Sequence, residues 1–130
     1  MSDDRRVPLI EGAIEAFNDE DVVRLLEFIH PEVRSRVAEG LGNPGTHEGI
    51  EGFGEMMADW SEAWSSNKVK LNDIEFVTDE VALVHVSQDL VGAGSGIPVG
   101  MENTFLIGFE GEQAIRFEIH PNRESSLNAL

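Results

Sequence analysis

The chain has 130 residues, of which 41% are hydrophobic, and a formal net charge of −16 from 9 basic and 25 acidic residues. This length and hydrophobic content predict one folded domain over residues 1–130. The negative charge argues against nucleic acid and anionic membranes as partners, because both repel an acidic surface. The chain contains no cysteine, which excludes disulfides, thiolate nucleophiles and cysteine metal ligands.

We expect no targeting segment. The first residues, MSDDRR, lack the apolar stretch of a signal peptide, and no apolar run reaches the length of a membrane span. No internal repeat, linker or low-complexity tract interrupts the chain. We therefore expect a soluble cytoplasmic protein.

The first half of the chain predicts three helices. Residues 7–17 carry apolar side chains at helical spacing on one face. Residues 21–29 predict a shorter helix whose acidic start suits the positive end of the helix dipole. Residues 49–64 show the strongest helical pattern, in which Ile50, Phe53, Met57, Trp60 and Trp64 recur every three or four residues. Core packing and lining of a ligand cavity both explain this pattern.

The remaining segments predict strands. Residues 32–39 form one candidate, and a glycine-rich loop follows at residues 40–45. Four more strands are expected at residues 68–78, 81–91, 98–109 and 114–120, with a short helix at 123–130. This order predicts an α+β fold, in which three main helices pack on a curved antiparallel sheet.

The last three strands each have one apolar and one polar side, because side chains alternate along a strand. The apolar row contains Val84, Val86, Phe105, Ile107, Phe117 and Ile119. The polar row contains His85, Asp89, Glu102, Thr104, Arg116, Glu118 and His120. Either row can in principle face the helices, so parity alone leaves two assignments open.

The C-terminal third contains an ordered set of short motifs. GAGSGIPV is followed by a strand and then by FEGEQAIRFEIHPNRESSLNAL. Their order and spacing resemble those of the SnoaL-like group of the NTF2-like superfamily. The residues that fit the pattern are Arg116, Glu118, Arg123, Glu124 and Leu127, whereas His120 and Asn122 depart from it. The resemblance implies a cone-shaped α+β barrel with a pocket between sheet and helices, and usually a homodimer.

The resemblance also favours one of the two assignments. In enzymes of this superfamily, pocket groups lie on the strands around the glycine turn and on the last strand. The matching positions here are Glu102, Thr104, Arg116, Glu118 and His120, with His85 and Asp89 on the preceding strand. We therefore expect the polar row to line the pocket together with Phe17, Phe53, Met57 and Trp60 from the helices. The apolar rows would then lie outside, at a dimer interface.

His120 is the leading candidate for general acid–base chemistry, since an imidazole titrates near neutral pH. Glu102 is its expected carboxylate partner across the strands, and His85 is the second candidate histidine. Glu118, two residues away on the same strand, is expected to lie roughly 7 Å from His120. The substitution His120→Asn is expected to keep the fold and to weaken ligand binding or turnover. No metal or cofactor is expected.

The enzymes of the superfamily give several comparisons. A ketosteroid-isomerase-like site uses a tyrosine, which this chain lacks, and the arginine of an epoxide-hydrolase-like site is not matched by Arg116. A cyclase-like site with His120, or a dehydratase-like site with His85 and His120, stays open. We expect a small apolar molecule as ligand, with isomerase, cyclase or dehydratase activity on a carbonyl or hydroxyl compound. The alternative is a non-catalytic ligand-binding or protein-interaction module of the same fold.

Overall fold

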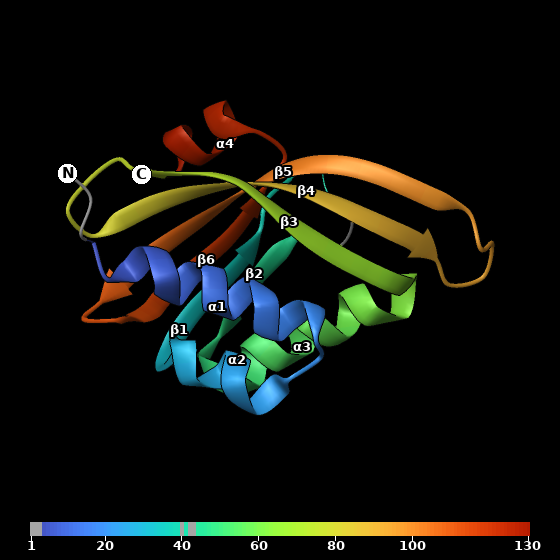
Figure 1. The fold of residues 1–130 in the computed structure, drawn as a ribbon, viewed down its shortest axis with the longest axis horizontal. Coiled ribbons are helices and arrows are strands. Elements are labelled where there is room, and N and C mark those ends of the chain that lie inside the picture. The colour runs from blue at the N-terminus through green and yellow to red at the C-terminus, as the bar shows by residue number, and fades with distance from the viewer. Residues whose placement is uncertain (1–3, 40, 42–43) are drawn as a thin grey trace.

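The computed structural model describes residues 4–39, 41 and 44–130 (Figure 1). The elements in chain order are α1 (Arg6–Asn18), α2 (Val22–Phe28), β1 (Ile29–Val37), β2 (Gly45–Glu48), α3 (Gly49–Ala63), β3 (Trp64–Phe76), β4 (Val81–Gly92), β5 (Pro98–Glu110), β6 (Gln113–His120) and α4 (Arg123–Asn128). Part of the loop expected at residues 40–45 lies outside the described residues, namely Gly40, Gly42 and Asn43.

The expected helices are all present, with ends close to the predicted ones. The Asp21 side chain accepts a hydrogen bond from the backbone N–H of Arg24 and so caps the start of α2. Helix α3 ends at Ala63, where the chain passes directly into β3. Among the described helices, none combines the length and the apolar character that a membrane crossing requires.

The six strands form one sheet in the order β2-β1-β6-β5-β4-β3. Strands β3 to β6 make the expected antiparallel meander. Strand β1 pairs with β6 in parallel, and β2 pairs antiparallel with β1 at the edge. The sequence did not predict β2, because its four residues, GTHE, show no apolar alternation. The α+β fold with a curved sheet is confirmed.

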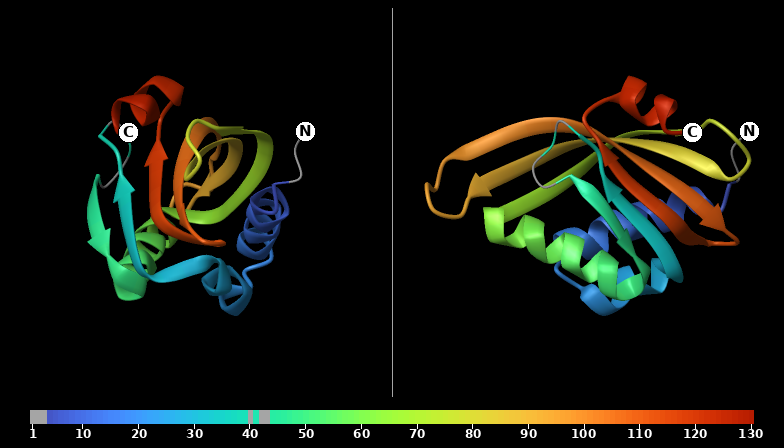
Figure 2. Two further views of the ribbon diagram at one scale, coloured as in Figure 1. Left: turned by 90° about the vertical axis from the view of Figure 1, so that its left-hand side faces the viewer. Right: turned by 180° about the vertical axis from the view of Figure 1, so that it is seen from behind.

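The sheet has two faces with different partners. Helices α1, α2 and α3 cover the inner face, whereas α4 lies on the outer face (Figures 1 and 2). The core fills the space between the inner face and the three helices. It includes Ile10 and Met56 from the helices and Val33, Val84 and Ile107 from the sheet. Removal of these side chains from water supplies the main driving force for this arrangement.

Helix α1 is also fastened to the edge of the sheet. The side-chain amide of Asn18 donates to the carbonyl of Val69 and accepts from its N–H, both at 2.8 Å. The amide thereby occupies hydrogen-bonding groups of the edge strand β3 that another chain would otherwise pair with. The ammonium group of Lys68 adds a bond of 2.6 Å to the Asn18 carbonyl. These contacts fix the end of α1 over the inner face.

Two glycines of α3 predict opposite effects of the same substitution. A Cβ on Gly52 would lie 2.9 Å from the Cβ of His47, whereas a Cβ on Gly54 would meet nothing within 4 Å. Gly52→Ala should therefore lower the free energy of unfolding by about 1–3 kcal/mol. Gly54→Ala should raise it by about 0.5–1 kcal/mol, because alanine favours the helix. Urea unfolding of both variants tests the packing of α3 against β2, and equal effects would contradict it.

Candidate functional site

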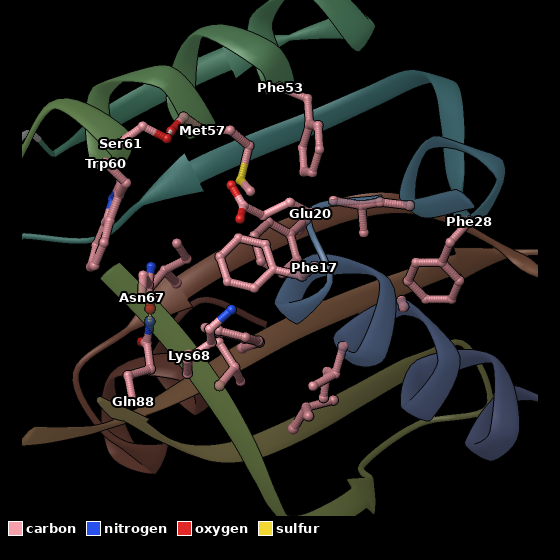
Figure 3. Close-up of a pocket in the computed structure, with 18 of the residues that line it drawn as sticks. Phe17, Glu20, Phe28, Phe53, Met57, Trp60, Ser61, Asn67, Lys68 and Gln88 are labelled. Atoms are coloured by element: carbon pink, nitrogen blue, oxygen red, sulfur yellow. Dashed lines mark hydrogen bonds between the residues drawn. The ribbon is translucent and has the colours of Figure 1, made fainter. Parts of the chain in front are cut away.

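A cavity of about 420 Å³ lies between the inner face and helices α1 to α3 (Figure 3). Its walls are mainly aromatic and aliphatic. The helices contribute Phe17, Phe53, Met57 and Trp60, as expected. The sheet contributes Val84, Phe105, Ile107, Phe117 and Ile119, which are members of the apolar row. The cavity is therefore lined by apolar side chains from both layers.

The expected assignment of the two rows was thus wrong, and the reverse assignment holds. None of His85, Asp89, Glu102, Thr104, Arg116, Glu118 and His120 lines the cavity. The physical reason is that the apolar stripes of α1 and α3 need an apolar surface to pack against, and only the apolar row provides one. Because side chains alternate, every residue of the polar row then points to the outer face.

A polar end interrupts this apolar lining. Gln88 and Asn67 lie near Trp60 at one end of the cavity (Figure 3). The Asn103 side chain donates to Gln88 Oε1 at 2.6 Å, and Gln88 Nε2 donates to Asn67 Oδ1 at 3.0 Å. We call these three residues the amide chain. The sequence analysis did not identify the amide chain. The position of Gln88 between Val86 and Leu90, in the apolar row of β4, could have indicated it, because a polar residue there interrupts an apolar row.

Charged side chains lie where the cavity opens to solvent. Glu20, from the turn between α1 and α2, and Lys68, from β3, both line the cavity and are exposed. Within residues 4–39, 41 and 44–130 they are the ionisable side chains of the lining, and no histidine belongs to it. Nor do these residues include a group of three or more His, Asp or Glu side chains that could hold a metal ion.

The polar row forms a separate cluster on the outer face. His120 is 1% exposed, and its Nε2 lies 2.7 Å from Glu118 Oε1. The expected distance of roughly 7 Å was wrong because it describes the backbone spacing, whereas these two side chains lean toward each other along β6. The other ring nitrogen, Nδ1, lies 2.8 Å from Ser125 Oγ in α4. His120 thus joins the sheet to the terminal helix.

Glu118 is the centre of this cluster. It is 5% exposed and accepts a hydrogen bond of 2.7 Å from Arg116 Nε, with Arg36 a further neighbour at 3.4 Å. Burial raises the pKa of the Glu118 carboxyl, but the hydrogen bonds from Arg116 and His120 outweigh burial and hold the pKa below its ordinary value. The carboxylate therefore stays ionised at neutral pH.

A second carboxylate, Glu75, extends the cluster across the sheet. Arg123 of α4 donates two hydrogen bonds to it, at 2.9 and 2.7 Å, and His85 Nε2 lies 3.3 Å away. The Arg123 bonds, followed by the His85 bond, lower the pKa of Glu75 to about 2. His85 also contacts Thr104 at 3.1 Å. We call the polar contacts around Glu75 and Glu118 the outer-face cluster.

Two predicted site residues stay outside both sites. Glu102 is exposed and lies opposite Ser87, whereas the residue opposite His120 is Thr104. Asp89 is exposed and lines a separate depression beside the β4–β5 hairpin. The structure therefore does not bring Glu102 to His120, and the proposed acid–base pair of these two residues is not formed.

The outer-face cluster predicts a pH-dependent contribution to stability. Because the pKa of Glu118 is depressed in the folded state, its stabilisation is complete above the ordinary glutamate pKa of about 4.3 and is lost as the pH falls through the folded pKa. Glu118→Gln should lower the free energy of unfolding by about 2 kcal/mol at pH 7, and this difference from wild type should shrink toward pH 3.

Urea unfolding at several pH values measures this difference. Glu124→Gln is the control, since it removes an exposed carboxylate of the neighbouring helix α4 and should change the free energy by less than about 0.5 kcal/mol. If the difference in free energy of unfolding between Glu118→Gln and wild type stays constant from pH 7 to pH 3, the depressed pKa of Glu118 is contradicted.

His120→Asn now has an outcome opposite to the one expected from the sequence. The shorter side chain cannot keep both bonds, to Glu118 and to Ser125, and it leaves a gap under α4. The free energy of unfolding should fall by about 2–3 kcal/mol. Affinity for an apolar probe of the cavity should stay unchanged, because His120 points to the other face. Thermal unfolding measures the stability and a fluorescence titration measures the affinity. Unchanged stability with weakened binding would support the sequence-based expectation that the polar row lines the cavity.

Comparisons with known proteins agree with this architecture. An NTF2-like protein of unknown function from Burkholderia pseudomallei K96243 is 18% identical, with a TM-score of 0.82 over 98% of this chain and 97% of that one. TerC, co-crystallised with polyporic acid, is 18% identical, with a TM-score of 0.80 over 96% of each chain. A putative polyketide cyclase from Xanthomonas campestris pv. campestris is also 18% identical, with a TM-score of 0.71 over 93% of each chain.

At these identities the solved structures show the fold alone. A comparison with curated proteins gives no match. The family model of the SnoaL-like domain, in contrast, matches residues 10–119, which include both layers of the fold and the cavity between them. The chain therefore belongs to the SnoaL-like domain family.

Proposed function

We propose that this protein binds a small, mainly apolar molecule in the cavity between the inner face and helices α1 to α3. The observation that carries the proposal is the cavity itself, a space of about 420 Å³ with aromatic walls inside an otherwise packed core. Protein interiors normally fill such space, since each unfilled volume lowers stability. Its size lies within the range of small-molecule sites.

The charge distribution narrows the ligand class. The net charge of −16 disfavours anions, whereas the opposite charges of Glu20 and Lys68 at the opening offset each other. The aromatic rings of the wall favour a ligand with planar or ring-shaped apolar parts. TerC, which shares the fold, was co-crystallised with polyporic acid, and another protein of this fold is described as a putative polyketide cyclase. These relatives support a small organic ligand.

Catalysis is the second candidate function, and Glu20 is the observation that favours it. Isomerase, cyclase or dehydratase chemistry needs a general acid or base near the ligand. Glu20 lines the cavity and supplies a carboxylate at its opening; its φ of 57° belongs to the C-terminal cap of α1, where the N–H of Asp21 donates to the carbonyl of Ala16. His120 and His85 lie on the other side of the sheet, so the carboxylate would take their place. Binding without turnover needs no such group and is the better supported function.

The homodimer was expected from the family resemblance and, separately, from an apolar sheet face that required a cover. In the structure that row lies toward the helices, so this argument no longer supports a dimer. The homodimer, the cytoplasmic location and the alternative role as a protein-interaction module stay predictions.

A substitution that fills the cavity tests the proposal. Ala13 lies on α1 and lines the cavity, so Ala13→Trp places an indole ring in the space. We expect the affinity for 1-aminoanthracene, a neutral tricyclic fluorophore, to fall at least about tenfold, because ligand and side chain compete for one volume. Ala58→Trp, on the exposed side of α3, is the control and should leave the affinity unchanged. Fluorescence titration measures both, and equal affinities in the two folded variants would contradict binding in this cavity.

A further inference from the structure

The amide chain is an unusual feature of the inner face. Gln88 and Asn103 are 3% and 4% exposed, and they stand in rows that are otherwise apolar. A buried amide costs free energy unless its hydrogen bonds are made, and an aliphatic residue at either position would pack the core without that cost. The fold alone therefore does not require these amides.

The direction of the hydrogen bonds leaves a donor at one end. Asn103 donates to Gln88, and Gln88 donates to Asn67. Asn67 Nδ2 is thus the last donor of the chain, and among the described residues no side chain or backbone group accepts from it. Hydrogen bonds in a series polarise one another, so the preceding two bonds strengthen this last N–H as a donor. Asn67 is part of the cavity wall.

The same end of the cavity contains a second donor. Trp60 lies near Asn67 in the cavity wall (Figure 3). Its indole Nε1 is buried and has no hydrogen-bond partner among the described residues. Indole N–H can only donate, so the buried Trp60 group lacks an acceptor, and the half-buried Asn67 amide has none among the described residues. Apart from Glu20 and Lys68 at the opening and the serines of α3 and β3, the rest of the wall is apolar.

We propose that Asn67 and Trp60 form a subsite that recognises an acceptor oxygen, specifically the carbonyl of a neutral ligand whose remaining surface is apolar. This inference rests on the proposed function and adds the chemical class and orientation of the ligand. The carbonyl lies at the end of the cavity formed by β3, β4 and α3, and the apolar body lies among the aromatic rings toward α1. Gln88 and Asn103 act as positioning residues, because they hold the Asn67 amide with its N–H available.

A matched pair of ligands tests the subsite. Fluorenone and fluorene have the same three-ring shape, and only fluorenone carries a carbonyl. We take the ratio of the fluorene Kd to the fluorenone Kd as the readout, because this ratio cancels effects on apolar binding. Asn67→Asp keeps the size of the side chain and its acceptor for Gln88, but removes the donor. The ratio should fall about fivefold in this variant, the equivalent of one hydrogen bond.

Two further measurements complete the experiment. Ser65→Ala removes another polar side chain of the cavity wall, one whose hydroxyl already donates to the carbonyl of Val91, and the ratio should stay within about twofold. In the wild-type protein, NMR should show a larger downfield shift of the Asn67 side-chain amide protons with fluorenone than with fluorene. This measurement needs no variant and so decides the matter even if Asn67→Asp fails to fold.

The outcomes separate the subsite from the proposed function. A ratio that falls in Asn67→Asp alone, or the carbonyl-dependent NMR shift, supports the subsite. If both ligands bind and neither the ratio nor the Asn67 signal depends on the carbonyl, the subsite is wrong and cavity binding stands. If neither ligand binds the wild-type protein and 1-aminoanthracene does not bind either, the proposed function fails, and the subsite fails with it.

Discussion

The alternation of side chains across one curved sheet governs the organisation of this protein. Each strand from β3 to β6 presents one row to helices α1 to α3 and the other row to the outer face. The helices bring apolar stripes, so the row with Val84, Ile107 and Ile119 must face them. This arrangement also determines that His120, Glu118 and Arg116 lie on the opposite face, because consecutive side chains of a strand point to opposite faces of the sheet.

The outer face shows how a buried charge is accommodated by geometry. Glu118 and His120 are almost fully enclosed beneath α4, a position that is costly for ionisable groups. The cost is offset because Arg116, Arg36 and Ser125 complete the hydrogen bonds of the pair. The pairing also demands one orientation of α4, since Arg123 must reach Glu75 at the same time. A histidine beside a carboxylate, which suggests acid–base chemistry when seen in isolation, here fastens a helix.

The inner face, in contrast to the polar outer face, is mainly apolar and borders a cavity. Its aromatic side chains come from elements far apart in the chain, and together they enclose a space instead of filling it. Among the described residues, the sheet interrupts these walls with the amide chain of Asn67, Gln88 and Asn103, which extends over three neighbouring strands, and with Ser65, Ser66 and Lys68 of β3. An apolar wall binds ligands with little discrimination, whereas a fixed donor rejects ligands that leave it unpaired. Under the proposed function, affinity and selectivity would therefore come from different parts of the same cavity.

The sequence by itself determined the helices, five of the six strands, the α+β class and the two rows of the last strands, because these depend on local periodicity. It also identified Phe17, Phe53, Met57 and Trp60, whose spacing on α1 and α3 marks one face. Only the tertiary structure decided which row faces the helices, since alternation is symmetric about the sheet and the choice depends on packing between distant elements. It likewise decided the pairing of β1 with β6, the partners of His120 and the position of Gln88, because each requires contacts between residues that the sequence separates.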